Sequence, residues 1–143
     1  WIDFPSLTTL TIGDQAFKNA TSFSMSKLPS IETIDIGNDC FKSITDNVYV
    51  SGLPELISLR IGSNSFYDGT NDILNTIFQV HNCPKLLSIE IGEYSFSKFG
   101  NNFNLISLPS LRSLTIGSIE NESNNFMHIP NLSIRSILNF ILY

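Results

Sequence analysis

One motif recurs along the whole chain, and this recurrence limits the possible folds more than any other sequence feature. Each copy of the motif contains a proline, and the prolines are Pro5, Pro29, Pro54, Pro84, Pro109 and Pro130. Consecutive prolines are 24, 25, 30, 25 and 21 residues apart. Self-similarity at a period of about 20 to 50 residues is typical of solenoids, in which one repeat cannot bury its apolar face until the next repeat stacks on it. The sequence therefore predicts a repeat protein in which each copy of the motif forms one coil.

Each proline is followed by an alternating apolar segment that predicts a β-strand. The apolar residues five positions after the proline are Leu10, Ile34, Leu59, Ile89 and Leu114, and those seven positions after it are Ile12, Ile36, Ile61, Ile91 and Ile116. A glycine follows directly in every coil, namely Gly13, Gly37, Gly62, Gly92 and Gly117. We expect these glycines to turn the corner of the coil with a positive φ, which glycine adopts without a steric penalty.

A phenylalanine four residues after the glycine marks the interior of the coil. These residues are Phe17, Phe41, Phe66 and Phe96, and we expect their rings to stack as a buried spine. A second alternating segment precedes the next proline, with Phe23, Val48, Phe78 and Phe103 six residues before it and Met25, Val50, Val80 and Leu105 four residues before it. Each coil thus holds two short strands, which pair in parallel with those of neighbouring coils about 4.8 Å away. The predicted fold is mainly β, a solenoid of about five coils with two parallel β-sheets.

The repeats predict a single domain over residues 1–143. The coils are regular over residues 4–117, and residues 118–143 form a degenerate C-terminal coil, as is typical of terminal repeats. The connection in the third coil carries an insertion, Tyr67 to Ile77, and insertions in solenoids collect in loops. Because Trp1 to Phe4 fall inside a repeat, we expect the sequence to be a fragment of a longer chain.

The repeat resembles that of the leucine-rich repeat family and is most similar to BspA-like surface-protein repeats. Those repeats pair an Ile-Gly-x-x-Ala-Phe segment with a segment in which an apolar residue precedes proline. Residues 12–17 of this chain, Ile-Gly-Asp-Gln-Ala-Phe, match the first segment at every fixed position, and residues 61–66, Ile-Gly-Ser-Asn-Ser-Phe, match it with serine in place of alanine. The resemblance implies a leucine-rich-repeat-type solenoid and a non-enzymatic role in recognition at a cell surface.

Two rows of residues on the first strand of each coil face outward and lie in register from coil to coil. One row contains only hydroxyl side chains: Thr9, Thr33, Ser58, Ser88 and Ser113. The other row alternates in charge at its centre: Thr11, Asp35, Arg60, Glu90 and Thr115. The structural interpretation is the default, because small β-compatible residues and alternating charges both support an in-register sheet. The alternative is a polar strip that binds a carbohydrate or a protein.

Ile57 and Leu87 adjoin these rows, and an exposed apolar patch beside charges is typical of a contact surface. The candidate recognition face therefore comprises Thr33, Asp35, Ile57, Ser58, Arg60, Leu87, Ser88 and Glu90. The second strands carry an outward row of uncharged polar residues, which could pack sideways against another copy of the chain. This row is Ser24, Tyr49, Gln79 and Asn104.

Residues with catalytic or metal-binding chemistry form no recognisable site. Cys40 and Cys83 occupy slots that small or apolar residues fill in other coils, which favours buried positions and makes a disulfide between such different slots geometrically unfavourable. His81 and His128 have no second ligand at metal spacing. No nucleophile elbow, P-loop or dinucleotide motif is present. The sequence predicts no enzyme activity, no cofactor and no metal.

Two hypotheses for function remain. The net charge of −5 and eight scattered Lys and Arg argue against nucleic acid as a partner. The first hypothesis is a scaffold that recognises a protein or glycan, and the alternative is a subunit of an extracellular fibre or coat, in which copies stack end to end because solenoid ends expose unpaired strands. Both place the protein outside the cell or at its surface, where Asn19, Asn121 and Asn131 would be candidate N-glycosylation sites. The sequence leaves membrane association open.

Overall fold

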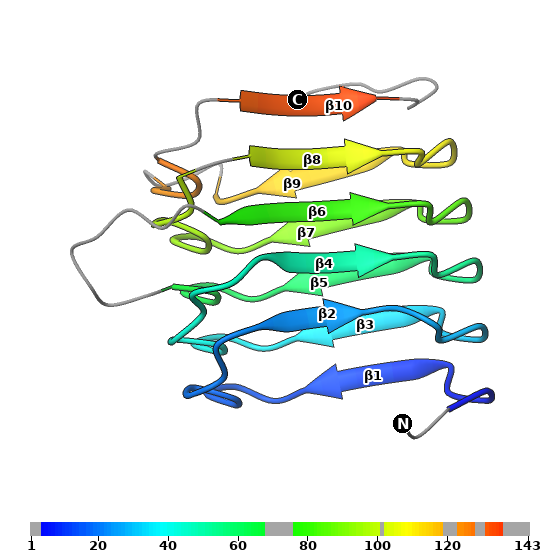
Figure 1. The fold of residues 1–143 in the computed structure, drawn as a ribbon, viewed down its shortest axis with the longest axis horizontal. Helices are drawn as coiled ribbons and strands as arrows, with labels where there is room; N and C mark the ends of the chain where they lie inside the picture. The colour runs from blue at the N-terminus through cyan, green and yellow to red at the C-terminus, as the bar shows by residue number, and fades with distance from the viewer. Residues whose placement is uncertain (1–3, 68–75, 101, 119–122, 128–130, 136–143) are drawn as a thin grey trace.

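The computed structural model describes residues 4–67, 76–100, 102–118, 123–127 and 131–135. Within these residues the chain is mainly β and contains no helix, and its parallel sheets form a β-solenoid of about four turns. The strands of successive coils stack along one axis, with a row of corners on either side (Figure 1). The predicted solenoid with two parallel sheets is confirmed, whereas the expected count of five coils stays a prediction.

Strands alternate between two five-stranded sheets as the chain proceeds. The first sheet, in spatial order, consists of β1 (Thr9–Ile12), β3 (Thr33–Ile36), β5 (Ser58–Ile61), β7 (Ser88–Ile91) and β9 (Ser113–Ile116). The second sheet consists of β2 (Phe23–Met25), β4 (Val48–Ser51), β6 (Ile77–His81), β8 (Asn102–Ile106) and β10 (Asn131–Arg135). Every neighbouring pair is parallel. Each coil therefore places one strand in each sheet.

Apolar residues at alternate positions fix the register of the first sheet. Leu10 lies opposite Ile34, and Ile12 lies opposite Ile36. The same register continues through β5, β7 and β9. In β3, β5 and β7 the second and fourth residues are buried, while the first and third reach solvent. Because a slip by one residue would turn the buried set outward, the alternation specifies this register, and the predicted pairing is confirmed.

A stack of phenylalanine rings runs through the interior at one row of corners. Consecutive rings of Phe17, Phe41, Phe66, Phe96 and Phe126 have centroids 5.3, 4.8, 4.7 and 4.9 Å apart and lie within 9° of parallel. Phe66 and Phe96 are fully buried and Phe41 nearly so, which confirms the predicted spine for the central coils. The Phe17 ring stacks as predicted, but its predicted burial is wrong, since it is 61% exposed and stacks on only one neighbour.

The glycines that follow the first strands have a different role from the predicted one. A positive φ occurs at Gly117 (79°), and the prediction is wrong for Gly13, Gly37, Gly62 and Gly92. A Cβ on Gly62 would lie 2.6 Å from the carbonyl carbon of Gly37, and a Cβ on Gly92 would lie 2.5 Å from the backbone nitrogen of Ser63. Such distances are far below van der Waals contact. Glycine is required in these coils because consecutive backbones touch at this corner.

The left-handed backbone conformations lie further along the same corner. They occur two residues after the glycine, at Gln15, Asp39, Asn64 and Tyr94, and at the five spine phenylalanines, whose φ angles lie between 50° and 57°. A bulky residue rarely adopts this conformation, which costs about 1–3 kcal/mol at each position. Burial of a phenyl ring contributes about 1.5–3 kcal/mol, and a stacked ring pair contributes about 0.5–1.5 kcal/mol. Burial and stacking of the phenyl rings therefore offset the backbone strain of the left-handed conformation at these residues.

In every coil after the first, the residue before the spine phenylalanine forms a side-chain hydrogen bond to the preceding coil. Ser65 Oγ donates to the carbonyl oxygen of Gly37 over 2.9 Å, and Ser95 Oγ donates to that of Gly62 over 2.8 Å. Equivalent donors in other coils are Cys40 Sγ and Asn125 Nδ2. Ser65 and Ser95 are fully buried, so these bonds give their hydroxyl groups the partners that buried polar groups require. We call the glycines, these small polar residues and the spine phenylalanines the glycine corner.

Parts of the sequence predictions concern residues outside the described ranges. Residues 68–75 of the expected insertion from Tyr67 to Ile77 lie outside them, as do 119–122, 128–130 and 136–143 of the expected C-terminal coil. The described part of that coil contributes Phe126 to the spine and β10 to the second sheet. Phe126 follows its glycine by nine residues instead of four, which explains why spacing alone did not assign it to the spine.

Candidate functional site

The outward face of the first sheet carries the two predicted rows of side chains. The register places Thr33, Ser58 and Ser88 side by side, and it places Arg60 between Asp35 and Glu90. All of these side chains reach solvent, whereas the alternating apolar residues of the same strands point into the core. The structure thus brings together the residues that the sequence grouped, and their binding of a partner stays a prediction.

Arg60 is the electrostatic centre of this face. Its Nη1 donates to Asp35 Oδ1 over 2.9 Å, and its Nε lies 3.8 Å from Glu90 Oε1. The hydrogen bond to Asp35 raises the pKa of the Arg60 guanidinium, burial opposes this shift, and the charges of Asp35, Glu90 and Asp14 add to it. The Arg60 side chain is 48% exposed, and ion pairs this exposed contribute about 0–1 kcal/mol each. The row orients charges on the surface more than it stabilises the fold.

Ile57 and Leu87 form the apolar part of the face. They are 40% and 39% exposed, and their backbones are joined because the Leu87 N–H donates to the Ile57 carbonyl oxygen over 2.8 Å. A polar pair flanks them, since Lys85 Nζ lies 2.6 Å from Glu55 Oε2. Sequence reasoning missed this ion pair, although both residues directly follow a proline and therefore share one slot in adjacent coils. The face combines two exposed aliphatic side chains with two groups of paired charges.

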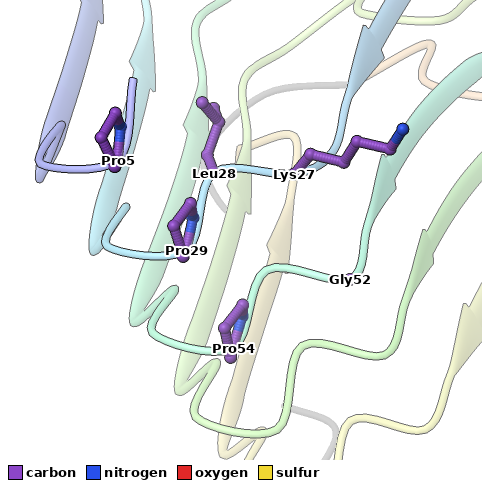
Figure 2. A pocket seen from close by; sticks show the side chains of 6 residues that line it. All are labelled: Pro5, Lys27, Leu28, Pro29, Gly52 and Pro54. Atoms are coloured by element: carbon purple, nitrogen blue, oxygen red, sulfur yellow. The ribbon is translucent and has the colours of Figure 1, made fainter. Parts of the chain in front are cut away.

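A trough runs along the other row of corners, where the second strand of each coil leads into the next coil (Figure 2). One part of it, of about 520 Å³, is lined by Pro5, Lys27, Leu28, Pro29, Gly52 and Pro54. The next part is lined by Gly52, Pro54, Asn82, Pro84, Ser107 and Pro109. The two parts share Gly52 and Pro54 in their linings, so they adjoin each other along this row of corners. We call this row of corners the proline corner.

A left-handed residue two positions before the proline shapes the proline corner at Pro29, Pro54, Pro84 and Pro109. These residues are Lys27, Gly52, Asn82 and Ser107, with φ angles between 54° and 63°. Sequence reasoning missed them, and the available signal was the presence of Gly and Asn, which favour this conformation, at that position in two coils. The trough is lined by proline rings and isolated polar groups, and the predicted recognition residues do not contribute to it.

The first coil of the described chain has an apolar surface beside β1 and β2. A hollow of about 540 Å³ lies there, and its apolar lining includes Leu10, Ala16, Phe17, Phe23, Met25 and Phe41. The ring of Phe17 presents one face toward this hollow, because the other face stacks on Phe41. A strand edge next to an apolar surface is a site where another strand can pair.

Residues with reactive side chains are dispersed in the part of the chain that the structure describes. Cys40 and Cys83 are both buried thiols, and burial raises the pKa of the Cys83 thiol against an opposing backbone hydrogen bond at Leu53. No group of three His, Cys, Asp or Glu is placed there to hold a metal ion. The same described ranges contain no helix of the length and apolarity that a membrane crossing requires.

The three candidate glycosylation sites differ in position. Asn19 is exposed at the end of the turn that follows β1. Asn131 is the first residue of β10, and Asn121 lies outside the described residues.

Comparison of the chain with models of protein families, with curated proteins and with solved structures gave no significant match.

Proposed function

We propose that the chain is a non-enzymatic scaffold of the leucine-rich-repeat type, with five coils, that binds a protein or glycan outside the cell or at its surface. The binding surface is the outward face of the first sheet: Thr33, Asp35, Ile57, Ser58, Arg60, Leu87, Ser88 and Glu90. The repeat motif supports the family, and the fifth strand in each sheet supports the number of coils. No cofactor is required for this role.

The observation that carries this proposal is the exposed pair Ile57 and Leu87 beside Arg60. Adjacent aliphatic side chains that are about 40% exposed lose contact with water when a partner covers them, and this burial favours association. Arginine is enriched among residues that dominate binding energy. The carboxylates of Asp35 and Glu90 keep the guanidinium at the centre of the face, where a partner can contact it without a large change in side-chain entropy.

Substitutions on this face test the proposal. The 143-residue chain is screened for binding to extracellular proteins and to a glycan array, and each interaction is then measured with Ile57→Asp and Arg60→Glu. We expect each change to weaken binding by about tenfold or more, or about 1.4 kcal/mol. The matched control is Asn82→Asp, an exposed substitution at the proline corner in a left-handed position that aspartate tolerates. Binding that is unchanged in both face variants would reject the first sheet as the contact surface.

A second function is favoured by the apolar hollow at the first coil. An apolar hollow lined by Phe17 and Leu10, next to the unpaired edge of β1, is suited to docking of the opposite end of another copy, so that the protomers build a fibre or coat. Head-to-tail contacts generate filaments when the rotation between copies does not close a ring. Light scattering and negative-stain electron microscopy of the 143-residue chain test this function. Filaments that shorten in Phe17→Asp would support it, and a concentrated solution that remains monomeric would reject it.

A further inference from the structure

The outward face of the second sheet differs from the rest of the surface because it carries almost no charge. Strands β2, β4, β6 and β8 contain no Asp, Glu, Lys or Arg, and in β10 Arg135 stands at the end of the strand. The central outward row of the sheet contains hydroxyl, phenol and amide groups, and it consists of Ser24, Tyr49, Gln79, Asn104 and Ser133. We call this surface the amide face.

Hydrogen bonds within the amide face hold its side chains in place. Asn47 Nδ2 donates to Tyr49 Oη over 2.9 Å, while Asn47 Oδ1 accepts from the Ile77 backbone N–H over 2.8 Å. Asn104 Nδ2 donates to Gln79 Oε1 over 3.4 Å. These bonds leave the Tyr49 hydroxyl proton and the Gln79 amide N–H groups without an acceptor among the described residues. The bond from Asn47 thus holds the Tyr49 side chain in place, and the Tyr49 hydroxyl and the Gln79 amide nitrogen can donate to a ligand.

We propose that the amide face binds a neutral, linear polysaccharide whose chain lies along the solenoid axis. A sugar ring presents neutral hydroxyl groups at its edge and C–H groups on its face. Amide and hydroxyl side chains pair with the sugar hydroxyls in both directions, and the half-buried ring of Tyr49 can stack on the C–H face. Because consecutive strands lie about 4.8 Å apart, successive coils can contact successive sugar rings.

The charge of the face decides between this ligand and others. An anionic polymer or nucleic acid requires a cluster of Lys and Arg, which β2, β4, β6 and β8 lack. The core of a protein interface is formed mainly by apolar anchors. The amide face offers two half-buried isoleucines, Ile77 and Ile106, at separate positions among polar side chains. A ligand that is itself uncharged and rich in hydroxyl groups has the matching chemistry.

This inference goes beyond the proposed role of the first sheet, and its test uses separate variants. The 143-residue chain is mixed with insoluble cellulose and chitin, and run in affinity gels that contain soluble β-1,3-glucan, mannan or, as the anionic comparison, polygalacturonate. We expect retention by at least one neutral polysaccharide and none by polygalacturonate. Tyr49→Ala and Gln79→Glu should each weaken retention by about tenfold, or about 1.4 kcal/mol. Tyr49→Phe should keep most of it because the ring remains.

The control is Lys18→Gln, an exposed substitution in the turn that follows β1, which should leave polysaccharide binding unchanged. Thermal unfolding of every variant establishes that the fold persists, and the pair Tyr49→Phe and Tyr49→Ala keeps the test valid if one variant is unstable. Absence of retention by all neutral polysaccharides would overturn the proposal. Retention that Arg60→Glu weakens as strongly as Tyr49→Ala does would also overturn it, because the polysaccharide would then bind the first sheet. A stable dimer that Gln79→Glu dissociates would overturn it too, because the occupant would then be a second copy.

Discussion

The glycine corner and the proline corner reverse the chain in every coil, yet they do so by opposite means. At the glycine corner, backbones of consecutive coils approach so closely that a Cβ on Gly62 would lie 2.6 Å from Gly37, and phenyl rings stack beneath them. At the proline corner, nothing lies within 4 Å of a Cβ on Gly52, and a trough remains open. Stability is therefore concentrated on the side of the glycine corner, and space for different side chains on the side of the proline corner.

The largest effect is expected at the centre of the spine. Phe66 is fully buried and stacks on Phe41 and Phe96 with centroids 4.8 and 4.7 Å away. We expect Phe66→Ala to lower the free energy of unfolding by about 3–5 kcal/mol, because it removes a large buried side chain and leaves a cavity. Equilibrium denaturation measures this loss. The matched control is Phe17→Ala, at an exposed ring, which should cost much less. A loss below about 1 kcal/mol for Phe66→Ala would mean that the spine does not hold the coils together.

Close backbone packing predicts a smaller but position-dependent effect for added methyl groups. Gly62→Ala places a Cβ against the backbones of Gly37 and Asn38, and such overpacking costs about 1–3 kcal/mol. Gly13→Ala is the control, because nothing lies within 4 Å of its Cβ in the first coil and its φ is not positive. This control should be neutral or should stabilise the fold by up to about 1 kcal/mol, because alanine lowers the conformational entropy of the unfolded chain. Equal destabilisation by the two changes would contradict the close-approach explanation of the glycines.

The sequence predicted the parts of the fold that depend on periodicity. Alternating Leu59 and Ile61 specify a strand and its register, because only one register buries both. The role of Gly62 could not be predicted, because a glycine that turns the chain and one that admits a neighbouring backbone look the same in sequence. The positive φ of Phe66 was unpredictable for a related reason. Local preference disfavours it, and tertiary packing of the ring imposes it.

The candidate site shows the same division. The order Asp35, Arg60 and Glu90 along one row followed from the period, and the ion pair between Arg60 and Asp35 follows from the order. The trough at the proline corner could not be predicted, because it results from backbone angles at Lys27 and Gly52 and from the depth of the space between coils. A repeat pattern shows which side chains fill the core, but it does not show which spaces on the surface remain unfilled.

The next effect on stability is expected from the ladder of small polar residues at the glycine corner, which consists of Cys40, Ser65, Ser95 and Asn125. Ser65 Oγ donates to the Gly37 carbonyl oxygen and accepts from the Cys40 backbone N–H over 3.1 Å. Ser65→Ala leaves both groups unsatisfied in a buried site, which we expect to cost about 1–3 kcal/mol. Ser65→Cys should recover part of this loss, since Cys40 Sγ makes the equivalent bond in its own coil. Chemical denaturation of the two variants measures the difference, and equal stability of Ser65→Ala and the parent chain would show that the ladder is dispensable.

The smallest effect is expected where the proline corner is most open. Gly52 has a φ of +63° and no atom within 4 Å of its Cβ, and Asn82 occupies the equivalent position with a φ of 54°. Gly52→Asn should therefore be accommodated in the left-handed conformation. It should change the free energy of unfolding by less than about 1 kcal/mol, because the lower conformational entropy of the unfolded chain stabilises the fold while mild backbone strain destabilises it. Gly52→Val, with a β-branched side chain that avoids this conformation, should destabilise by more. If Gly52→Asn lowered the free energy of unfolding as much as Gly62→Ala, the two corners would be equally constrained. Positions that tolerate substitution would then lie on the faces of the sheets instead.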